Sequence, residues 1–269
     1  MGSEGRSVMI VSLYRYLFWP LLLGLWSSWL WLASSLQAEG PSLGCETSYP
    51  LARCERVCFQ GKGRLILESG DEPSLSIKME KGWIPLVYWS LRQGSLVISV
   101  AEAPFAPVDS LPLFRLRLPL LERLEAGGST CIESAAFTAD SRLKLQLSGR
   151  SRADLTLDGQ LLRVDLCDEA SAKLQGRVEK QVIDQRGSGQ YSAFDLFSQR
   201  SKVRLYGTGW VELQVKSFLS AEILGSGQLI YQGVPAIREK IAGAGAVTPC
   251  LGPSCHPVRE RSLALPAMR

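Results

Sequence analysis

Two aspartates of this sequence have a side chain and a spacing that could support catalysis. Asp165 and Asp184 lie 19 positions apart and occupy equivalent positions in a repeat described below. If the repeats stack as strands, their carboxyl groups lie about 5 Å apart, and a retaining glycosidase places its two carboxyl groups at this separation. The alternative is an exposed ladder of charges in which Arg204 offsets Asp184, with each pair worth less than about 1 kcal/mol. We expect the ladder, because nothing in the sequence marks a cleft around the pair.

Other catalytic or metal-binding arrangements have little support. The only histidine, His256, lies in the C-terminal tail, so a Ser-His or Cys-His nucleophile system inside the repeats is excluded. Cys250, Cys255 and His256 could supply three metal ligands. Their flanks are rich in proline, however, and no second cluster lies nearby in the sequence. We therefore expect no metal, no cofactor and no enzymatic activity.

Seven cysteines indicate an oxidising compartment and leave one thiol unpaired. They stand at positions 45, 54, 58, 131, 167, 250 and 255. We expect Cys45, Cys54 and Cys58 to share one disulfide and one free thiol, and Cys250 and Cys255 to close a small loop. An alternative for Cys45 is lipidation, because "SLGC" resembles a lipoprotein processing site, although its leucine is one position closer to the cysteine than that class prefers.

The N-terminus carries the features of an export signal. Arg6 and Arg15 precede an uncharged, mainly apolar run from Leu17 to Gln37, and "SLQAEG" offers a small residue for cleavage after Ala38. The alternative is an uncleaved membrane anchor, because the run is just long enough to span a bilayer. Either alternative places the rest of the chain outside the cytoplasm.

The charge of the central region is close to neutral. The 269 residues carry a formal net charge of +4, of which the leader through Ala38 supplies +1 and the tail from Thr248 supplies +2. About +1 is left for the middle of the chain, which gives no electrostatic case for a nucleic-acid partner.

A glycine-containing unit recurs along the chain with a period of about 19 residues. It is visible in "LYGTGWVEL" (205–213) and in "ILGSGQLIY" (223–231). Only Asp168 departs from glycine at the first position of the unit, and the residue two positions later is always small. The first positions are Gly128, Gly149, Asp168, Gly187, Gly207, Gly225 and Gly243, and the later ones are Thr130, Ser151, Ala170, Gly189, Gly209, Gly227 and Gly245.

Apolar residues alternate with polar residues on both sides of each unit. The column two residues before the unit is interrupted only by Gln185, and it contains Ala126, Leu147, Leu166, Gln185, Leu205, Ile223 and Ile241. Alternation is typical of strands, and a corner with small residues suits a tight bend where Cβ atoms would crowd. We therefore predict an all-β fold, a single-stranded, right-handed parallel β-helix whose coils contain about 19 residues and whose apolar columns fill the interior.

The order of these motifs resembles a known family. From "FQGKGRLILESGD" through "FRLRLPLLERLEAGGS" to "LSAEILGSGQLIYQG", the region from Cys54 to Val247 resembles the head GIN domain of putative autotransporter adhesins. The resemblance implies an exported, bacterial parallel β-helix, and it brings no catalytic residues. The segment from Cys167 to Ala170 departs from the glycine corner, which bears on the geometry of that coil.

Four regions follow from these patterns. We expect a signal peptide or anchor in residues 1–38, a linker in 39–53, the β-helix in 54–247 and a flexible, proline-rich tail in 248–269. Within the β-helix, residues 54–119 should form irregular opening coils with a loop at "AEAPFAPVDS". Trp83, Tyr88 and Trp89 should pack inside the opening coil.

The preferred function is a non-catalytic, adhesin-like binding module of the cell envelope or surface. Trp210 should point outward in the same column as Gln190 and Gln228, and an exposed tryptophan among polar residues suits stacking on a sugar. The alternative is that Trp210 lies flat over a corner and shields the backbone. The expected partners are an envelope or extracellular glycan or a protein. Contact with a membrane is expected only through the N-terminal segment or a lipid on Cys45.

A structural role is the third alternative. The ends of a β-helix present unpaired strand edges, so modules of this kind can stack end to end as homo-oligomers. The tail and the "CERVC" segment are candidates to cap the two ends.

Overall fold

The computed structural model describes residues 45–101 and 111–250. The expected signal peptide, most of the "AEAPFAPVDS" loop and the tail beyond Cys250 lie outside these residues. In the part that is described, no helix is both long and apolar enough to cross a membrane. All the described residues belong to one compact unit.

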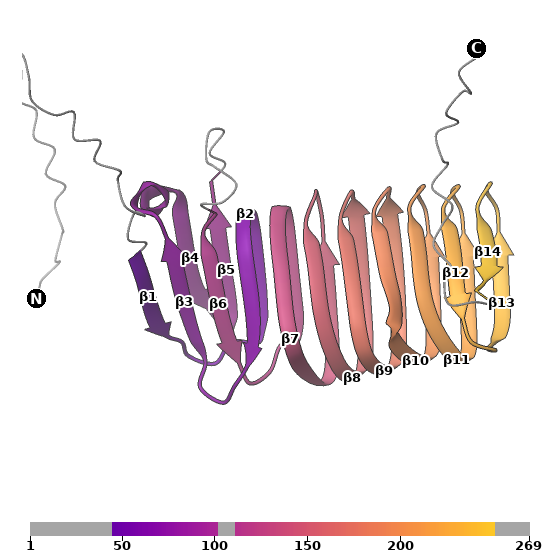
Figure 1. Ribbon diagram of the computed structural model, residues 1–269, viewed down its shortest axis with the longest axis horizontal. Coiled ribbons are helices and arrows are strands. Elements are labelled where there is room, and N and C mark those ends of the chain that lie inside the picture. Colours follow the sequence, from indigo (N-terminus) through magenta and orange to yellow (C-terminus); the bar gives the residue numbers. More distant parts are fainter. Residues whose placement is uncertain (1–44, 102–110, 251–269) are drawn as a thin grey trace, which may run out of the picture. The chain divides into compact units, whose positions relative to one another are not determined.

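Stacked parallel strands form the body of this unit (Figure 1). Neighbouring strands pair one repeat apart, so that Asp165 of one coil lies beside Asp184 of the next. The result is a parallel β-helix of about six turns with coils of about 19 residues, which confirms the predicted fold class. The strands are β2 (Arg56–Ser69), β7 (Arg123–Leu147), β8 (Arg152–Asp168), β9 (Ser171–Gly187), β10 (Gln190–Leu205), β11 (Trp210–Ile223), β12 (Gln228–Gln232), β13 (Ala236–Ile241) and β14 (Ala246–Pro249).

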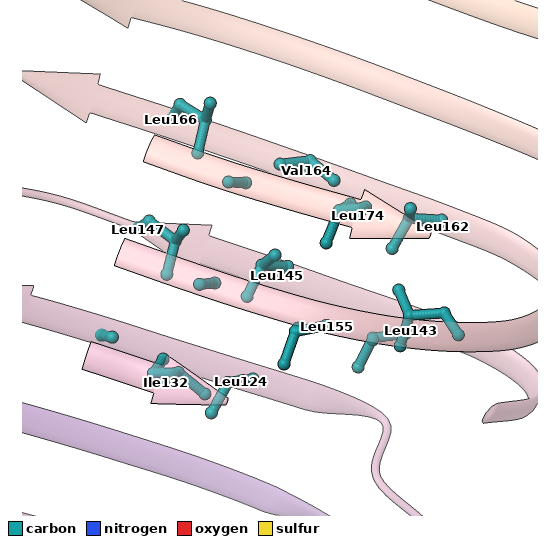
Figure 2. Close-up of a cluster of buried hydrophobic side chains, with 14 of the residues drawn as sticks. Leu124, Ile132, Leu143, Leu145, Leu147, Leu155, Leu162, Val164, Leu166 and Leu174 are labelled. Atoms are coloured by element: carbon teal, nitrogen blue, oxygen red, sulfur yellow. The ribbon is translucent and has the colours of Figure 1, made fainter. Parts of the chain in front are cut away.

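The predicted apolar columns fill the interior of the coils. Figure 2 shows leucines of β7, β8 and β9 gathered between the two arms of successive coils. The side chains of Leu147, Leu166 and Leu205 are at most 2% exposed. The column ends at Ile241, which is 44% exposed because β13 lies at the edge of the sheet. Burial of these columns is the main source of stability in the fold.

Several polar side chains of the interior are hydrogen-bonded to neighbouring groups. Gln185 donates a hydrogen bond from Nε2 to the carbonyl oxygen of Gly189. Tyr191 donates to Oε1 of Gln181 at 2.7 Å, and Gln181 donates to the hydroxyl oxygens of Ser198 and Ser201 at 2.9 and 3.0 Å. Burial raises the pKa of Tyr191, so its phenol stays protonated and remains a donor. These bonds offset the cost of placing polar side chains in the core.

The corners explain the recurring glycines. A Cβ on Gly207 would overlap the carbonyl oxygen of Gly187 on the preceding coil, and a Cβ on Gly225 would overlap that of Gly207. Asp168 replaces glycine where the backbone is left-handed, with φ of 59°. Aspartate tolerates this conformation better than most residues, and its Oδ2 accepts a hydrogen bond of 3.0 Å from the amide of Gly149. The departure at Asp168 therefore preserves the corner.

The opening region differs from the expected irregular coils. It combines parallel pairing with antiparallel strands, in which β1 (Cys45–Pro50), β3 (Ser74–Met79) and β6 (Leu113–Leu118) pair in that order. A hairpin of β4 (Val87–Arg92) and β5 (Ser95–Val100) follows the short 3-10 helix η1 (Lys81–Leu86). β1 also occupies part of the segment expected to be a linker. Alternation of apolar residues is the same in both pairing directions, so it could not reveal this arrangement.

Two of the three aromatic residues of this region pack as expected. Trp83 is 4% exposed, and the ring of Trp89 lies 4.9 Å from that of Tyr49. The prediction for Tyr88 is wrong, because this side chain is 60% exposed. Tyr88 lies on β4, where its neighbours Val87 and Trp89 are the residues that pack against the core.

The expected disulfide among Cys45, Cys54 and Cys58 is not formed, because Cys54 and Cys58 are both free thiols. Cys54 is buried in the core, whereas Cys58 lies between the inward-facing Val57 and Phe59 and therefore faces outward. The two sulfur atoms thus lie on different sides of the strand wall. The predicted bond between Cys250 and Cys255 stays a prediction, because Cys255 lies outside the described residues.

Candidate functional site

Two outward faces of the coils carry the candidate residues. The pre-corner face is the outer side of the segments that come before each corner: 56–60, 123–127, 142–147, 161–166, 180–185, 200–205, 218–223 and 236–241. The post-corner face is the outer side of the segments that follow: 64–69, 131–134, 152–158, 171–175, 190–195, 210–216, 228–232 and 246–249. Within each face, equivalent residues are neighbours on adjacent strands.

Asp165 and Asp184 are neighbours on the pre-corner face, as predicted. Asp184 lies between two arginines. Its Oδ2 accepts hydrogen bonds from Nη2 of Arg163 at 3.1 Å and Nη2 of Arg204 at 3.2 Å. Asp165 accepts a hydrogen bond of 3.3 Å from Gln146 and lies 3.7 Å from the ammonium nitrogen of Lys144. The charge ladder is therefore present and includes Arg163 and Lys144 from the neighbouring column.

The ladder is less solvated than expected. The side chain of Asp184 is only 3% exposed and that of Asp165 is 15% exposed. The long side chains of Arg163 and Arg204 cover Asp184, which alternation alone does not reveal. The oxygens that a glycosidase would turn toward a sugar face the chain's own side chains: guanidinium groups at Asp184, and an ammonium, an amide and a guanidinium group at Asp165. A groove of about 220 Å³ reaches Asp165, Gln146 and Arg186, but Asp184 does not line it.

Trp210, Gln190 and Gln228 are direct neighbours on the post-corner face, as the sequence predicted. Trp210 is partly exposed and Gln228 is exposed. The indole Nε1 is buried and has no hydrogen-bond acceptor among the described residues. Because an indole nitrogen is a donor only, this group is an unused donor between two amide side chains.

Glu212 extends this group and was not singled out in the sequence. It lies two residues after Trp210 on the same outer side of β11, and its Oε2 accepts a hydrogen bond of 2.8 Å from Ser192 of β10. Glu212 is 3% exposed and has no ion pair with any described residue. In the sequence, Glu212 is recognisable only as a charged residue in the column next to that of Trp210. The structure adds that its carboxylate is buried and forms no ion pair with a described cation.

Two cysteines of the described region, Cys54 and Cys131, do not have the character of nucleophiles. Burial is the main cause that raises the pKa of Cys54. For Cys131, burial and then the nearby Glu133 carboxylate raise the pKa. Thiols with raised pKa values are protonated near neutral pH and react slowly. Residues 45–101 and 111–250 also contain no group of three His, Cys, Asp or Glu side chains placed to hold a metal.

Comparison with known proteins places the chain in a structural class. Solved structures share the fold over most of their length. A putative lipid binding protein from Parabacteroides distasonis has a TM-score of 0.62 and 17% identity, with 78% of this chain and 98% of that chain covered. A putative adhesin from Bacteroides fragilis has a TM-score of 0.65 and 17% identity, with 77% and 95% covered. A putative adhesin from Parabacteroides merdae has a TM-score of 0.54 and 18% identity, with 78% and 98% covered.

No curated protein matches the sequence. The family model described as "putative auto-transporter adhesin, head GIN domain" matches residues 55–235, which is more than half of the chain. This chain therefore belongs to the family of putative auto-transporter adhesins defined by the head GIN domain.

Proposed function

We propose that the chain is an exported, non-catalytic binding module of the bacterial cell envelope or surface, and that its ligand is a carbohydrate. The family's description as an adhesin supports a binding role. Carbohydrate is proposed as the ligand because Trp210, Gln190 and Gln228 lie together on three adjacent strands. We name these three residues and Glu212 the Trp210 site.

The chemistry of the Trp210 site suits a sugar ring. The apolar face of a hexose stacks on an aromatic ring, while its hydroxyl groups need donors and acceptors around the edge. Gln190 and Gln228 supply both donors and acceptors. Glu212 is buried beside them and supports the neighbouring strand through the hydrogen bond that it accepts from Ser192.

The test is a screen of the mature chain against an array of bacterial envelope glycans. We expect retention of at least one glycan by the natural chain and weaker retention by Trp210→Ala. Tyr88→Ala is the matched control, because it removes an aromatic ring that is 60% exposed in the opening region. Loss of retention in both variants, or in neither, would contradict a role for the Trp210 site.

Export is a separate part of the proposal. The charged start and apolar run support cleavage after Ala38, which would give a mature chain that begins at Glu39. Mass spectrometry of the exported chain tests this directly. A mass that retains the leader would indicate an anchor, and a diacylglyceryl mass on Cys45 would indicate a lipoprotein.

End-to-end assembly is the second candidate function. The observation in its favour is the edge strand β13, where Ile237 and Ile241 are 41% and 44% exposed. Against it, Glu239 lies between them in an interior column, as the register partner of Ala221. An inward-pointing charge on an edge strand discourages pairing with another chain. Light scattering of the mature chain at increasing concentration tests this candidate, and a ladder of sizes would support it.

A further inference from the structure

The central region is close to neutral overall, but positive and negative charges are distributed unevenly between its pre-corner and post-corner segments. The pre-corner segments carry an excess of six positive charges, whereas the post-corner segments carry an excess of two negative charges. The basic residues of the pre-corner segments are Arg56, Arg123, Arg142, Lys144, Arg163, Lys180, Arg200, Lys202, Arg204, Arg238 and Lys240, and their acidic residues are Glu125, Asp165, Asp184, Glu222 and Glu239. The post-corner segments contain Arg64, Arg152, Lys173 and Lys216 against Glu68, Glu133, Asp154, Asp158, Asp195 and Glu212.

The acidic residues of the pre-corner face are largely engaged by cations of the same face. Asp165 and Asp184 are held by the charge ladder, and Glu222 pairs with Lys240 at 3.1 Å. Several other cations of this face are exposed and form no ion pair with a described residue, and four of them lie on β9, β10 and β13. They include Arg142, Lys180, Arg200, Lys202 and Arg238. Positive charge therefore remains available at the C-terminal half of the face.

Three of these free cations are immediate neighbours. Lys180 of β9 lies beside Arg200 of β10, and Lys202 projects from the same side of β10 two residues later. Arg200 also lies beside Phe218 of β11, whose side chain is 40% exposed. Lys202 is followed across β11 and β13 by Ser220 and Arg238. We name Lys180, Arg200, Lys202, Phe218 and Arg238 the basic patch.

The geometry of the basic patch points to a linear anion. Lys180 stands on the strand adjacent to that of Arg200 and Lys202, about 4.8 Å away. Arg238 stands two strands beyond Lys202. The cations therefore form a track across the coils rather than a closed pocket. Arginine and lysine bind sulfate, phosphate and carboxylate groups, and Phe218 adds an aromatic surface beside them. A membrane surface is less favoured, because Phe218 is a single exposed apolar side chain among these charges.

We propose that the basic patch binds an anionic polysaccharide. Its negative groups would meet Lys180, Arg200, Lys202 and Arg238 along the track. The surface is separate from the Trp210 site, and the proposal does not depend on the sugar assigned to that site. The choice of a polysaccharide over a nucleic acid rests on the proposed export of the chain, because an exported envelope module encounters envelope polysaccharides.

The probe is heparin, and chemically desulfated heparin, which keeps only its carboxylates, is the comparison polymer of lower charge. The natural chain should bind heparin and lose affinity as salt rises, because displacement of counterions drives such binding. Lys180→Gln/Arg200→Gln/Lys202→Gln should lower the affinity at least about tenfold. It should also reduce the slope of log affinity against log salt by about two to three, at roughly one per removed contact.

A matched control removes the same charge from the other face. Arg152→Gln/Lys173→Gln/Lys216→Gln changes three exposed cations of the post-corner face and should leave heparin affinity within about twofold. Equal losses in both triple variants would show a general charge effect and overturn the proposal. An unchanged heparin affinity of the triple variant at Lys180, Arg200 and Lys202 would overturn it as well.

Two further binding measurements distinguish an anionic polysaccharide from other polyanions. Tighter binding of a DNA duplex than of heparin, or capture by phosphatidylglycerol vesicles without heparin binding, would overturn the choice of polysaccharide. Trp210→Ala should leave heparin affinity unchanged, and the pre-corner triple variant should leave retention by neutral glycans unchanged. A failure of the Trp210 site is therefore distinguishable from a failure of the basic patch.

Discussion

Arg204 reaches one coil back to Asp184, and its Nε lies 2.7 Å from Oδ1 of this carboxylate, which is only 3% exposed. The hydrogen bond of the pair runs from Nη2 of Arg204 to Oδ2 of Asp184, at 3.2 Å. Arg163 contacts the same carboxylate from the coil before. Three consecutive coils are thus joined across the pre-corner face by one aspartate, which gives Asp184 a structural role.

Asp184→Asn should destabilise the fold without removing an activity. The variant leaves Arg163 and Arg204 without the carboxylate that they share, and we expect a loss of about 1–3 kcal/mol in the free energy of unfolding. Asp165→Asn should cost under about 1 kcal/mol, because its partners are more exposed. Urea denaturation measures both values. Release of reducing sugars by the natural chain, abolished in either folded variant, would instead support a glycosidase.

Leu205→Asp should prevent folding or destabilise it severely. Leu205 is 1% exposed in an interior column, and an unpaired carboxylate there should cost more than about 3 kcal/mol. Thr208→Asp introduces the same side chain at an exposed corner tip and should be tolerated. Thermal melts of the two variants check the inward and outward assignments, and similar melting temperatures would contradict them.

Gly207→Ala should weaken the stacking of the coils. A methyl group at this position would overlap the carbonyl oxygen of Gly187, so the backbone has to shift. We expect a loss of about 1–3 kcal/mol. Gly82→Ala is the control, because no atom lies within 4 Å of its added Cβ, and its effect should stay within about 0.5 kcal/mol. Equal midpoints in urea would show that the corner is not crowded.

Glu239→Ile should promote association of the C-terminal edge. The substitution removes the inward charge of β13 and adds a third isoleucine to the alternating pair of Ile237 and Ile241. We expect a concentration-dependent dimer in size-exclusion chromatography with light scattering. Lys240→Ile adds the same side chain on the outward side of the strand and should stay monomeric if the natural chain does. A monomeric Glu239→Ile variant would show that this charge does not protect the edge.

The repeat made most of the β-helix predictable, whereas features that depend on contacts between columns were not. Alternation and the corner recur in every unit of the repeat, with glycine at each corner except Asp168, so each unit indicates the same geometry. The opening strands do not share this period, and their alternation does not reveal the antiparallel pairing of β1, β3 and β6. Asp184 and Arg204 were assigned to one ladder from their spacing. The burial of Asp184 could not be predicted, because it depends on how Arg163 and Arg204 lie over it.

The Trp210 site was likewise predicted only in part, because some of its features depend on contacts between columns. Stacking of equivalent positions brings Gln190, Trp210 and Gln228 together, and the period alone predicts this. Glu212 and the basic patch depend on which charges find partners in neighbouring columns. That information emerges only when the side chains are placed.

Isothermal titration calorimetry of the natural chain and Trp210→Ala, with the neutral envelope glycan that the array retains most strongly, tests the proposed binding function most directly. If the indole ring stacks on the sugar, the variant should lose about 1–3 kcal/mol of binding free energy, roughly a 5-fold to 150-fold weaker affinity. The melting temperature of the variant should match that of the natural chain. An unchanged affinity at equal stability would contradict the Trp210 site, and a lower melting temperature with unchanged affinity would show that Trp210 only shields the corner.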